Sequence, residues 1–365
     1  MNQNLIGNDE VRFSRVVISQ DFLRIEDGKK DLFSTPFKRN SRWMFELVGS
    51  QIIKALGGIE HKFIFGDENG KESLRWKIYS KACLPFCTLS WAKLYSLPNE
   101  YELALEAEVV KAFDESLVIS FEMPDSILEI FTKNKIPYVD LSNHPIRFLP
   151  DYLFGIRTNV MSWQNNLRKS ALSYDIVKEF ARITKAKASR INVFENIEEY
   201  SVLFLGQMPI DSSLIYNGQI ADEEKVKDEL LKASMAYPKV WYKPHPHNKS
   251  VDTILKYCST LGIQIADFNI YDCFGSGKFV KTIGLSSGGL FEAQFFDIES
   301  ERLLNKPYYF ADNSNEALFY HPIYTDCLSY KYWEHIINGT EYTQKFVPNP
   351  YDGAIKFSLA MKWGR

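Results

Sequence analysis

The sequence predicts an α/β fold of two domains that face each other across a central cleft. The chain has 365 residues, more than a single core of common size contains. Hydrophobic residues make up 45% and charged residues 24%, values near the average for a globular protein. Short apolar strands alternate with helical segments in both halves, and this alternation is typical of parallel sheets covered by helices.

The first elements of the chain alternate between helix and strand. Residues 41–57 carry apolar side chains at helical spacing, and Gly57 and Gly58 end this helix. Residues 61–66 read as a strand or a buried turn, and residues 99–113 as an amphipathic helix. The chain therefore begins with mixed α/β structure.

A β-α-β unit follows. The apolar strand 117–122 ends at Glu122, the helix 125–134 comes next, and the strand 136–142 completes the unit. Two strands joined by one helix are parallel neighbours in a sheet. The first half therefore contains a parallel sheet.

A polar, helical segment at residues 173–199 separates the halves. The alternation restarts after it, so we expect a first domain over 1–195, a second over 196–340, and a C-terminal segment, 341–365, that packs back on the first domain. The elements expected in the second domain are a strand 202–207, a helix 222–236, a strand 239–244, a helix 250–261, a strand 263–267, a strand 279–285 and a helix that opens at 288–296.

Composition excludes several classes of protein. The net charge of −3 gives no basic excess that would favour nucleic acid as a partner. The N-terminus lacks a secretory signal, and no apolar run is long enough to span a bilayer. The five cysteines are odd in number, and only Cys83 and Cys87 are close in sequence, which favours free thiols in a reducing cytoplasm.

Three polar loops follow strands of the second half. They are Gln207–Ser213, Lys243–Asn248 and Leu285–Gly289. In an open parallel sheet, ligands bind outside the carboxyl ends of the strands. We therefore expect these loops to share one edge of the sheet and to form a binding site there.

The loop LSSGG, residues 285–289, has two readings. Ser286 and Ser287 offer hydroxyl groups, and Gly288 allows the backbone close to a ligand at a helix start, which suits a bound anion. The alternative is an ordinary serine N-cap followed by flexible glycines. The loop matches neither of the common glycine-rich nucleotide-binding patterns.

The segment KPHPH holds a histidine between two prolines. Pro244 and Pro246 favour an extended backbone, which displays His245 rigidly. Lys243 and His245 can both donate to a phosphate. The alternative is a proline-rich strand exit with an exposed histidine.

Asp211 lies in the pattern Q-x-x-x-D-x-S, on the same expected edge as these cationic and hydroxyl groups. A carboxylate beside an anion site is unfavourable unless it has a chemical role. The alternative is that Asp211 or Ser212 caps a short helix. Taken with the other two loops, the pattern favours a catalytic carboxylate.

The three loops together resemble the retaining β-Kdo glycosyltransferases of bacterial polysaccharide synthesis, both the WbbB-type enzymes of glycosyltransferase family 99 and the related KpsC-type capsule enzymes. The similar motifs are Q-x-x-x-D-x-S at 207–213, K-P-H-P at 243–246, and Ser-Ser-Gly leading into F-E-A from 286. The segment 120–159 also resembles the family's first domain. The resemblance covers about residues 120–293, and it lies in the order and spacing of motifs rather than in any one of them.

The resemblance implies a GT-B-like fold of two Rossmann-like domains with a central cleft, and transfer of Kdo from CMP-β-Kdo with retention of configuration in O-antigen or capsule synthesis. It implies that Asp211 is the nucleophile, that His245 holds the departing phosphate, and that Glu122 is the acid/base across the cleft. The residues that the resemblance and the loops assign to the donor are Gln207, Ser213, Lys243, Ser286, Ser287 and Gly288.

Further expectations concern charge and partners. A CMP-sugar has one phosphate, and the sequence contains no D-x-D, so we expect no metal and no other cofactor. Arg147 and Arg157 are candidates to contact the Kdo carboxylate or the acceptor, with salt bridges as the alternative. The expected partner is a glycan or lipid-linked glycan acceptor, with the inner-membrane surface or other modules of a multidomain glycosyltransferase as further contacts.

The chain departs from the pattern of these families in two respects, and two alternatives to a retaining Kdo transferase stay open. KpsC-type enzymes carry two catalytic modules on a longer chain, whereas this chain has one, and the Gly-Gly after Ser287 is closer to the WbbB-type pattern. One alternative is an inverting, sialyltransferase-like enzyme using another CMP-nonulosonate. The other is a non-catalytic glycan- or nucleotide-binding module of a polysaccharide-assembly protein.

Overall fold

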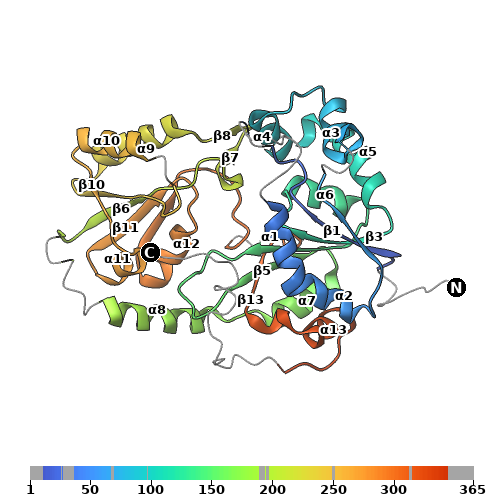
Figure 1. The fold of residues 1–365 in the computed structure, drawn as a ribbon. Coiled ribbons are helices and arrows are strands. Elements are labelled where there is room, and N and C mark those ends of the chain that lie inside the picture. The colour runs from blue at the N-terminus through green and yellow to red at the C-terminus, as the bar shows by residue number, and fades with distance from the viewer. Residues whose placement is uncertain are drawn as a thin grey trace.

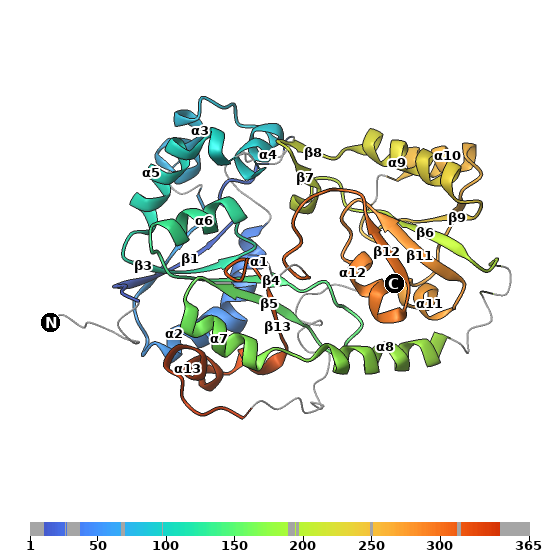
Figure 2. The same ribbon diagram turned by 180° about the vertical axis from the view of Figure 1, so that it is seen from behind.

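The computed structural model describes residues 11–25, 27, 37–66, 70–96, 98–188, 194, 197–248, 251–311 and 315–343. These residues form two α/β lobes, seen side by side in Figure 1 and from behind in Figure 2. The predicted two-domain α/β fold is confirmed.

The first domain is built on a six-stranded sheet with the order β13-β5-β4-β3-β1-β2. Strands β1 to β4 are parallel, and β5 is antiparallel to both of its neighbours. The strands are β1 (Arg15–Gln20), β2 (His61–Ile64), β3 (Ser116–Phe121), β4 (Tyr138–Asn143), β5 (Phe154–Thr158) and β13 (His321–Ile323).

Helices cover both faces of this sheet. Successive strand residues point to opposite faces, so Val16 and Ile18 belong to one hydrophobic core and Val17 to another. The helices of this domain are α1 (Phe37–Met44), α2 (Ser50–Ala55), α3 (Leu74–Lys81), α4 (Thr88–Ser96), α5 (Glu102–Phe113), α6 (Asp125–Lys133), α7 (Met161–Ser170) and α13 (Tyr330–Asn338), with a π-helical segment at Phe45–Gly49.

The second domain has a five-stranded, wholly parallel sheet with the order β10-β9-β6-β11-β12. Its strands are β6 (Ser201–Leu205), β9 (Val240–Lys243), β10 (Gln264–Ile265), β11 (Phe279–Gly284) and β12 (Glu299–Arg302). Its helices are α8 (Tyr174–Ala188), α9 (Glu223–Ala236), α10 (Asp252–Thr260), α11 (Ile270–Gly275) and α12 (Gly289–Ala293). A hairpin, β7 (Ile215–Tyr216) and β8 (Gln219–Ile220), reaches toward the first domain (Figure 1).

Each sheet reverses its strand order at one point, between β1 and β3 in the first domain and between β6 and β11 in the second. A crevice forms at such a switch point because the helices after the two strands lie on opposite faces. The loops that leave the carboxyl ends of these four strands therefore position the site.

The end of the second predicted domain differs from the structure. The prediction assigned residues 196–340 to the second domain, but β13 pairs with β5 in the first sheet. Trp333 and Ile336 on α13 are buried in the first core, against α2 and α7. Antiparallel pairing and apolar burial thus return the chain to the first domain before residue 340.

Several single helices and strands also differ from the prediction. The strands β1 and β5 and the helices α3, α4 and α7 were not predicted from the sequence. Helix α8 runs from Tyr174 to Ala188 within the predicted helical segment 173–199; residues 189–193 and 195–196 of that segment, and with them the predicted boundary at 195, lie outside the described residues. Of the predicted C-terminal segment, Tyr342 contacts the first core, whereas 344–365 lie outside the described residues.

All five cysteines are free thiols. Among the described residues, no helix is both long and apolar enough to cross a bilayer.

Candidate active site

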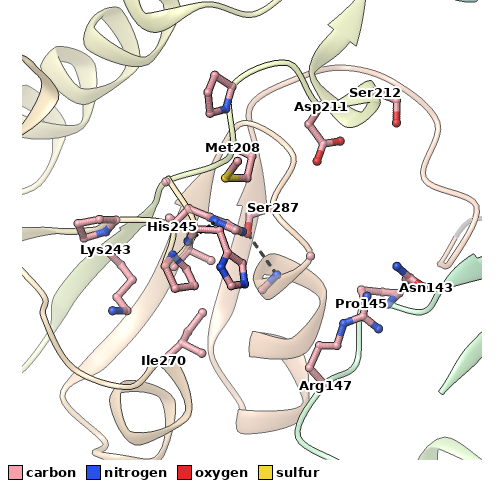
Figure 3. A pocket seen from close by; sticks show the side chains of 18 of the residues that line it. Asn143, Pro145, Arg147, Met208, Asp211, Ser212, Lys243, His245, Ile270 and Ser287 are labelled. Atoms are coloured by element: carbon pink, nitrogen blue, oxygen red, sulfur yellow. Dashed lines mark hydrogen bonds between the residues drawn. The ribbon is translucent and has the colours of Figure 1, made fainter. Parts of the chain in front are cut away.

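A cleft of about 920 Å³ lies between the two domains, within the range of about 300–1,000 Å³ usual for small-molecule sites. Figure 3 shows its lining side chains. Its lining includes Arg24, Glu122, Asn143 and Arg147 from the first domain, and Asp211, Lys243, His245, Ser287 and Gly288 from the second.

The positions of these residues follow from the topology. Arg24 and Glu122 follow β1 and β3, the strands at the first switch point. Asp211 and Ser287 follow β6 and β11, the strands at the second. The two switch points thus contribute facing walls of one cleft.

Asp211 is held by the local backbone. Its Oδ1 accepts a hydrogen bond from the Ser213 N–H at 2.8 Å, so it caps the short 3-10 helix Ser212–Leu214. The alternative role predicted for Asp211, that of a helix cap, is therefore observed. Oδ2 has no hydrogen-bond partner among the residues that the structure describes. Figure 3 shows the carboxylate directed into open space opposite Asn143 and Arg147.

The residue before Asp211 has an unusual backbone. Ile210 has φ of +59°, a region that β-branched side chains rarely adopt. Such a conformation costs on the order of 1–3 kcal/mol and persists only where surrounding contacts hold it. The loop is therefore fixed by its environment in a shape that aims Asp211 at the cleft.

Glu122 faces Asp211 from the first domain. It directly follows β3 with φ of +51°, and its Oε1 accepts a hydrogen bond from the Ser142 hydroxyl at 3.2 Å. Burial raises the pKa of Glu122 to about 7, and the negative charge of Asp211 adds to the increase. A carboxyl with this pKa can accept or give a proton near neutral pH.

Lys243 ends β9, and His245 comes two residues later, on the same side of the cleft as Asp211. His245 Nδ1 accepts from the His247 N–H at 3.2 Å, so the neutral ring carries its proton on Nε2 and can donate from there. Burial lowers the pKa of His245, while the charge of Asp211 opposes the decrease. Burial also lowers the pKa of Lys243. Two hydrogen-bond donors of the second domain therefore line the cleft.

Arg147 lines the opposite side of the cleft (Figure 3). Its backbone N–H donates to Glu292 Oε1 at 2.6 Å, and its guanidinium donates to the His144 carbonyl. Tyr271 donates its hydroxyl to the same Glu292 oxygen at 3.0 Å. Glu292, which belongs to α12, thereby links the two domains at the cleft floor.

Behind the cleft lies a layer of three residues that the sequence assigned to binding of the CMP-sugar: Gln207, Ser213 and Ser286. The Gln207 side-chain amide donates to Ser213 at 3.2 Å and to Ser286 at 2.9 Å, and its Oε1 accepts from the Ser286 N–H at 2.8 Å. None of the three lines the cleft; Gln207 lines a smaller cavity of about 400 Å³ on the other side of the loop. Their visible role is to tie the loops after β6 and β11 together.

Ser287 and Gly288 do line the cleft. Ser287 Oγ accepts from the Gly289 N–H at 3.3 Å, which leaves its proton available to a ligand. A Cβ on Gly288 would come within 3.2 Å of Pro145, so the glycine allows the two domains to approach closely. The close packing against Pro145 therefore explains the glycine at position 288 whether or not a ligand binds there.

Arg157 lies away from the cleft. Its guanidinium donates to Asp140 at 2.9 Å, to Asp125 at 2.8 Å and to the carbonyls of Leu318 and Met123, each at 3.1 Å. Only 2% of its side chain is exposed. The predicted contact with substrate is not supported by this position, because the buried acceptors of the first domain hold the guanidinium.

Arg24 and Asn143 are among the cleft residues that were not predicted from the sequence. Arg24 follows β1, which was not recognised as a strand. Asn143 ends β4, and its Oδ1 has no hydrogen-bond partner among the described residues. Extending the rule that cleft residues follow strands to β1 and β4 would have found both.

Taken together, two carboxylates lie on opposite sides of a cleft, and hydrogen-bond donors line the side that carries Asp211. This arrangement can form and break a bond at an electrophilic carbon while a proton moves on the opposite side.

No protein-family model and no curated protein sequence matches this chain. Similar solved structures include two from Thermosulfurimonas dismutans. KpsC, beta Kdo 2,7 transferase, is 13% identical, and the match covers 53% of this chain and 67% of that chain with a TM-score of 0.33. KpsC, beta Kdo 2,4 transferase, is 15% identical, and the match covers 51% of this chain and 67% of that chain with a TM-score of 0.32. The UDP-GlcNAc 2-epimerase of Methanocaldococcus jannaschii is 12% identical over 95% and 99% (TM-score 0.32). These TM-scores lie below 0.5, so the functional argument rests on the motifs and the cleft.

Proposed function

We propose that this protein is a retaining β-Kdo transferase that moves Kdo from CMP-β-Kdo to a glycan acceptor. The observation that carries the proposal is the pair of facing carboxylates. Asp211 presents a free oxygen to the cleft, and Glu122 opposite has a pKa of about 7. The choice of Kdo rests on the motif order at Gln207–Ser213, Lys243–Pro246 and Ser286–Gly288.

In the first step, Asp211 Oδ2 attacks C2 of the donor sugar. The bond between C2 and the phosphate oxygen breaks, and its electron pair leaves with CMP. Lys243 and the Nε2–H of His245 stabilise the charge that develops on the phosphate. A Kdo ester of Asp211 with inverted configuration results.

In the second step, an acceptor hydroxyl attacks C2 from the face that CMP vacated. Glu122 takes the hydroxyl proton, and the Asp211 carboxylate leaves with the electron pair of the ester bond. Two inversions give net retention. Because Glu122 must be ionised to accept this proton, its pKa of about 7 permits the step near neutral pH.

Other groups have supporting roles in this scheme. Arg147 lies where it can pair with the Kdo carboxylate, and Ser287 can donate to the phosphate. The cationic and hydroxyl groups beside Asp211 serve in place of a metal, and the absence of a metal requirement stays a prediction. We propose that the acceptor, free or lipid-linked, enters from the Glu122 side.

Two observations favour a second candidate. Asp211 caps a helix, and Glu122 has the pKa that a general base needs, so an inverting CMP-nonulosonate transferase could work with Glu122 alone. In that reaction the acceptor attacks the donor directly and no ester forms.

Incubation with CMP-Kdo, generated in situ, tests the proposal. The acceptor panel ends in GlcNAc, galactose, rhamnose or Kdo, and NMR assigns the anomeric configuration of the product. We expect a β-linked Kdo product. An α-linked product would indicate inversion, and nucleotide binding without CMP release for any acceptor would indicate a non-catalytic binding module.

A further inference from the structure

Two cations hold the loop that presents Asp211, and neither takes part in the proposed bond-forming steps. Lys306, beyond β12, donates from Nζ to the carbonyls of Ser212 at 3.2 Å, Ser213 at 3.4 Å and Ile215 at 3.2 Å. A lysine ammonium has three donors, and here each has an acceptor in the turn that Asp211 caps.

Arg24 holds the other side of Asp211. Its Nη2 donates to the Ile210 carbonyl at 2.8 Å, across a sequence separation of 186 residues. The guanidinium lies over the Trp91 ring, 4.7 Å from its centroid, and Trp91 donates to the buried carboxylate of Asp21 at 2.9 Å. Arg24 is therefore anchored in the first domain while it holds a backbone group of the second.

The hairpin that follows this loop and Lys306 each contact the first domain as well. The Gly218 N–H, in the hairpin that follows, donates to the Ser96 hydroxyl of α4 at 2.7 Å. Lys306 lies 5.8 Å from the ring centroid of Tyr95, also on α4. The loop after β6 thus bridges the two domains at the rim of the cleft.

We infer that Arg24 and Lys306 are positioning residues that hold the Ile210–Ser213 turn in the conformation that aims Asp211 at the donor sugar. We call these two residues and their bonds to the turn the clamp. Arg24 fixes the carbonyl of the strained Ile210, and Lys306 fixes the carbonyls that follow Asp211. Because Arg24 belongs to the first domain, the aim of Asp211 depends on the domains being docked. This inference rests on the proposed role of Asp211.

The first test measures amide hydrogen exchange in the full chain, which needs no activity. Lys306→Met keeps the length of the side chain and removes its donors. We expect exchange in the peptide covering 207–216 to become at least about tenfold faster, with no change in the peptide covering β3. Lys232→Met is the control, because Lys232 is an exposed lysine on α9. Unchanged exchange at 207–216 would overturn the clamp.

The second test separates positioning from donor contact. Lys306 does not line the cleft, so we expect Lys306→Met to lower kcat with CMP-Kdo by about 10–100-fold while the Kd for CMP changes less than about twofold. For Arg24→Met we expect the same loss, and Arg24→Lys, which keeps one charged donor, should restore part of kcat. Wild-type kcat in Lys306→Met, or a loss of CMP affinity that accounts for the whole defect, would refute the positioning role.

The two tests also distinguish this inference from the proposed function. If the wild-type protein transfers nothing from CMP-Kdo, the proposed function fails, whereas faster exchange at 207–216 in Lys306→Met still shows that the clamp holds the loop. If transfer occurs and the exchange does not change, the clamp alone is wrong.

Discussion

Glu122→Gln should make the protein more stable and less active at the same time. Burial and the charge of Asp211 raise the pKa of this carboxyl from 4.5 to about 7. At pH 8 the folded state must carry a charge that its surroundings disfavour, whereas the unfolded chain carries it freely. Glutamine has the same shape and no charge, so it removes this cost while keeping a group that Ser142 can contact.

The size of the effect follows from linkage. A pKa that moves from 4.5 to about 7 corresponds to up to about 3 kcal/mol, at about 1.4 kcal/mol for each tenfold change. Below pH 4.5 the carboxyl is protonated in both states and the cost vanishes. It grows as the pH rises and is complete above pH 7. With about 2.1 cal/mol/K of unfolding entropy per residue, 3 kcal/mol corresponds to a Tm increase of about 4 °C for this chain.

Thermal melts at pH 4 and pH 8, together with transfer assays at pH 8, measure both effects. Glu122→Gln should melt about 4 °C higher than wild type at pH 8 and within about 1 °C of it at pH 4. Transfer should fall by about 10²–10⁴, with CMP-Kdo binding retained. Glu115→Gln is the matched control, since Glu115 is exposed, lies just before the same strand and also has a positive φ.

Two outcomes would refute this reasoning. Equal Tm values for Glu122→Gln and wild type at pH 8 would show that the carboxyl is not disfavoured by its surroundings. Full transfer activity in Glu122→Gln would show that it does not take the acceptor proton.

Three further predictions concern the cleft and the first core. His245→Ala should lower kcat by about 10²–10³, because one donor to the leaving phosphate is lost, and a steady-state assay that finds wild-type kcat would remove His245 from that role. Transfer should persist in EDTA, since Lys243 and the Nε2–H of His245 can stabilise the leaving phosphate without a metal; a complete loss that Mg²⁺ restores would show that the donor class is wrong. Arg157→Met should destabilise the fold by about 3–5 kcal/mol, because it leaves Asp140 buried without its partner, and an unchanged Tm with weakened donor binding would instead support a substrate contact.

The sequence predicted those site residues that directly follow recognisable apolar strands. Glu122 follows β3, Asp211 lies in the loop after β6, and His245 comes two residues after β9. Each strand is mostly apolar, and the carboxyl ends of parallel strands lie at one edge of their sheet. The cleft could therefore be located before its geometry was known.

The roles of other residues could not be predicted, because they depend on contacts between residues that are distant in sequence. Arg24 and Lys306 bind backbone carbonyls, and a carbonyl leaves no trace in the sequence. For Arg157 the sequence left a substrate contact and a salt bridge open, because its salt-bridge partners, Asp125 and Asp140, are distant in sequence and meet it only in the folded domain. Strand β13 is three residues long, too short for any periodicity, and its place in the first sheet comes from pairing with β5.

The most direct test of the central claim is intact-protein mass spectrometry with CMP-Kdo present and acceptor absent. If Asp211 attacks C2, the protein should gain the mass of one Kdo residue, and peptide mapping should place it on the peptide containing QMPIDSSL, residues 207–214. Asp211→Ala should show no adduct and should lose transfer. An Asp211→Ala protein that still transfers Kdo with retention would contradict the mechanism and reduce Asp211 to the cap of the Ser212–Leu214 helix.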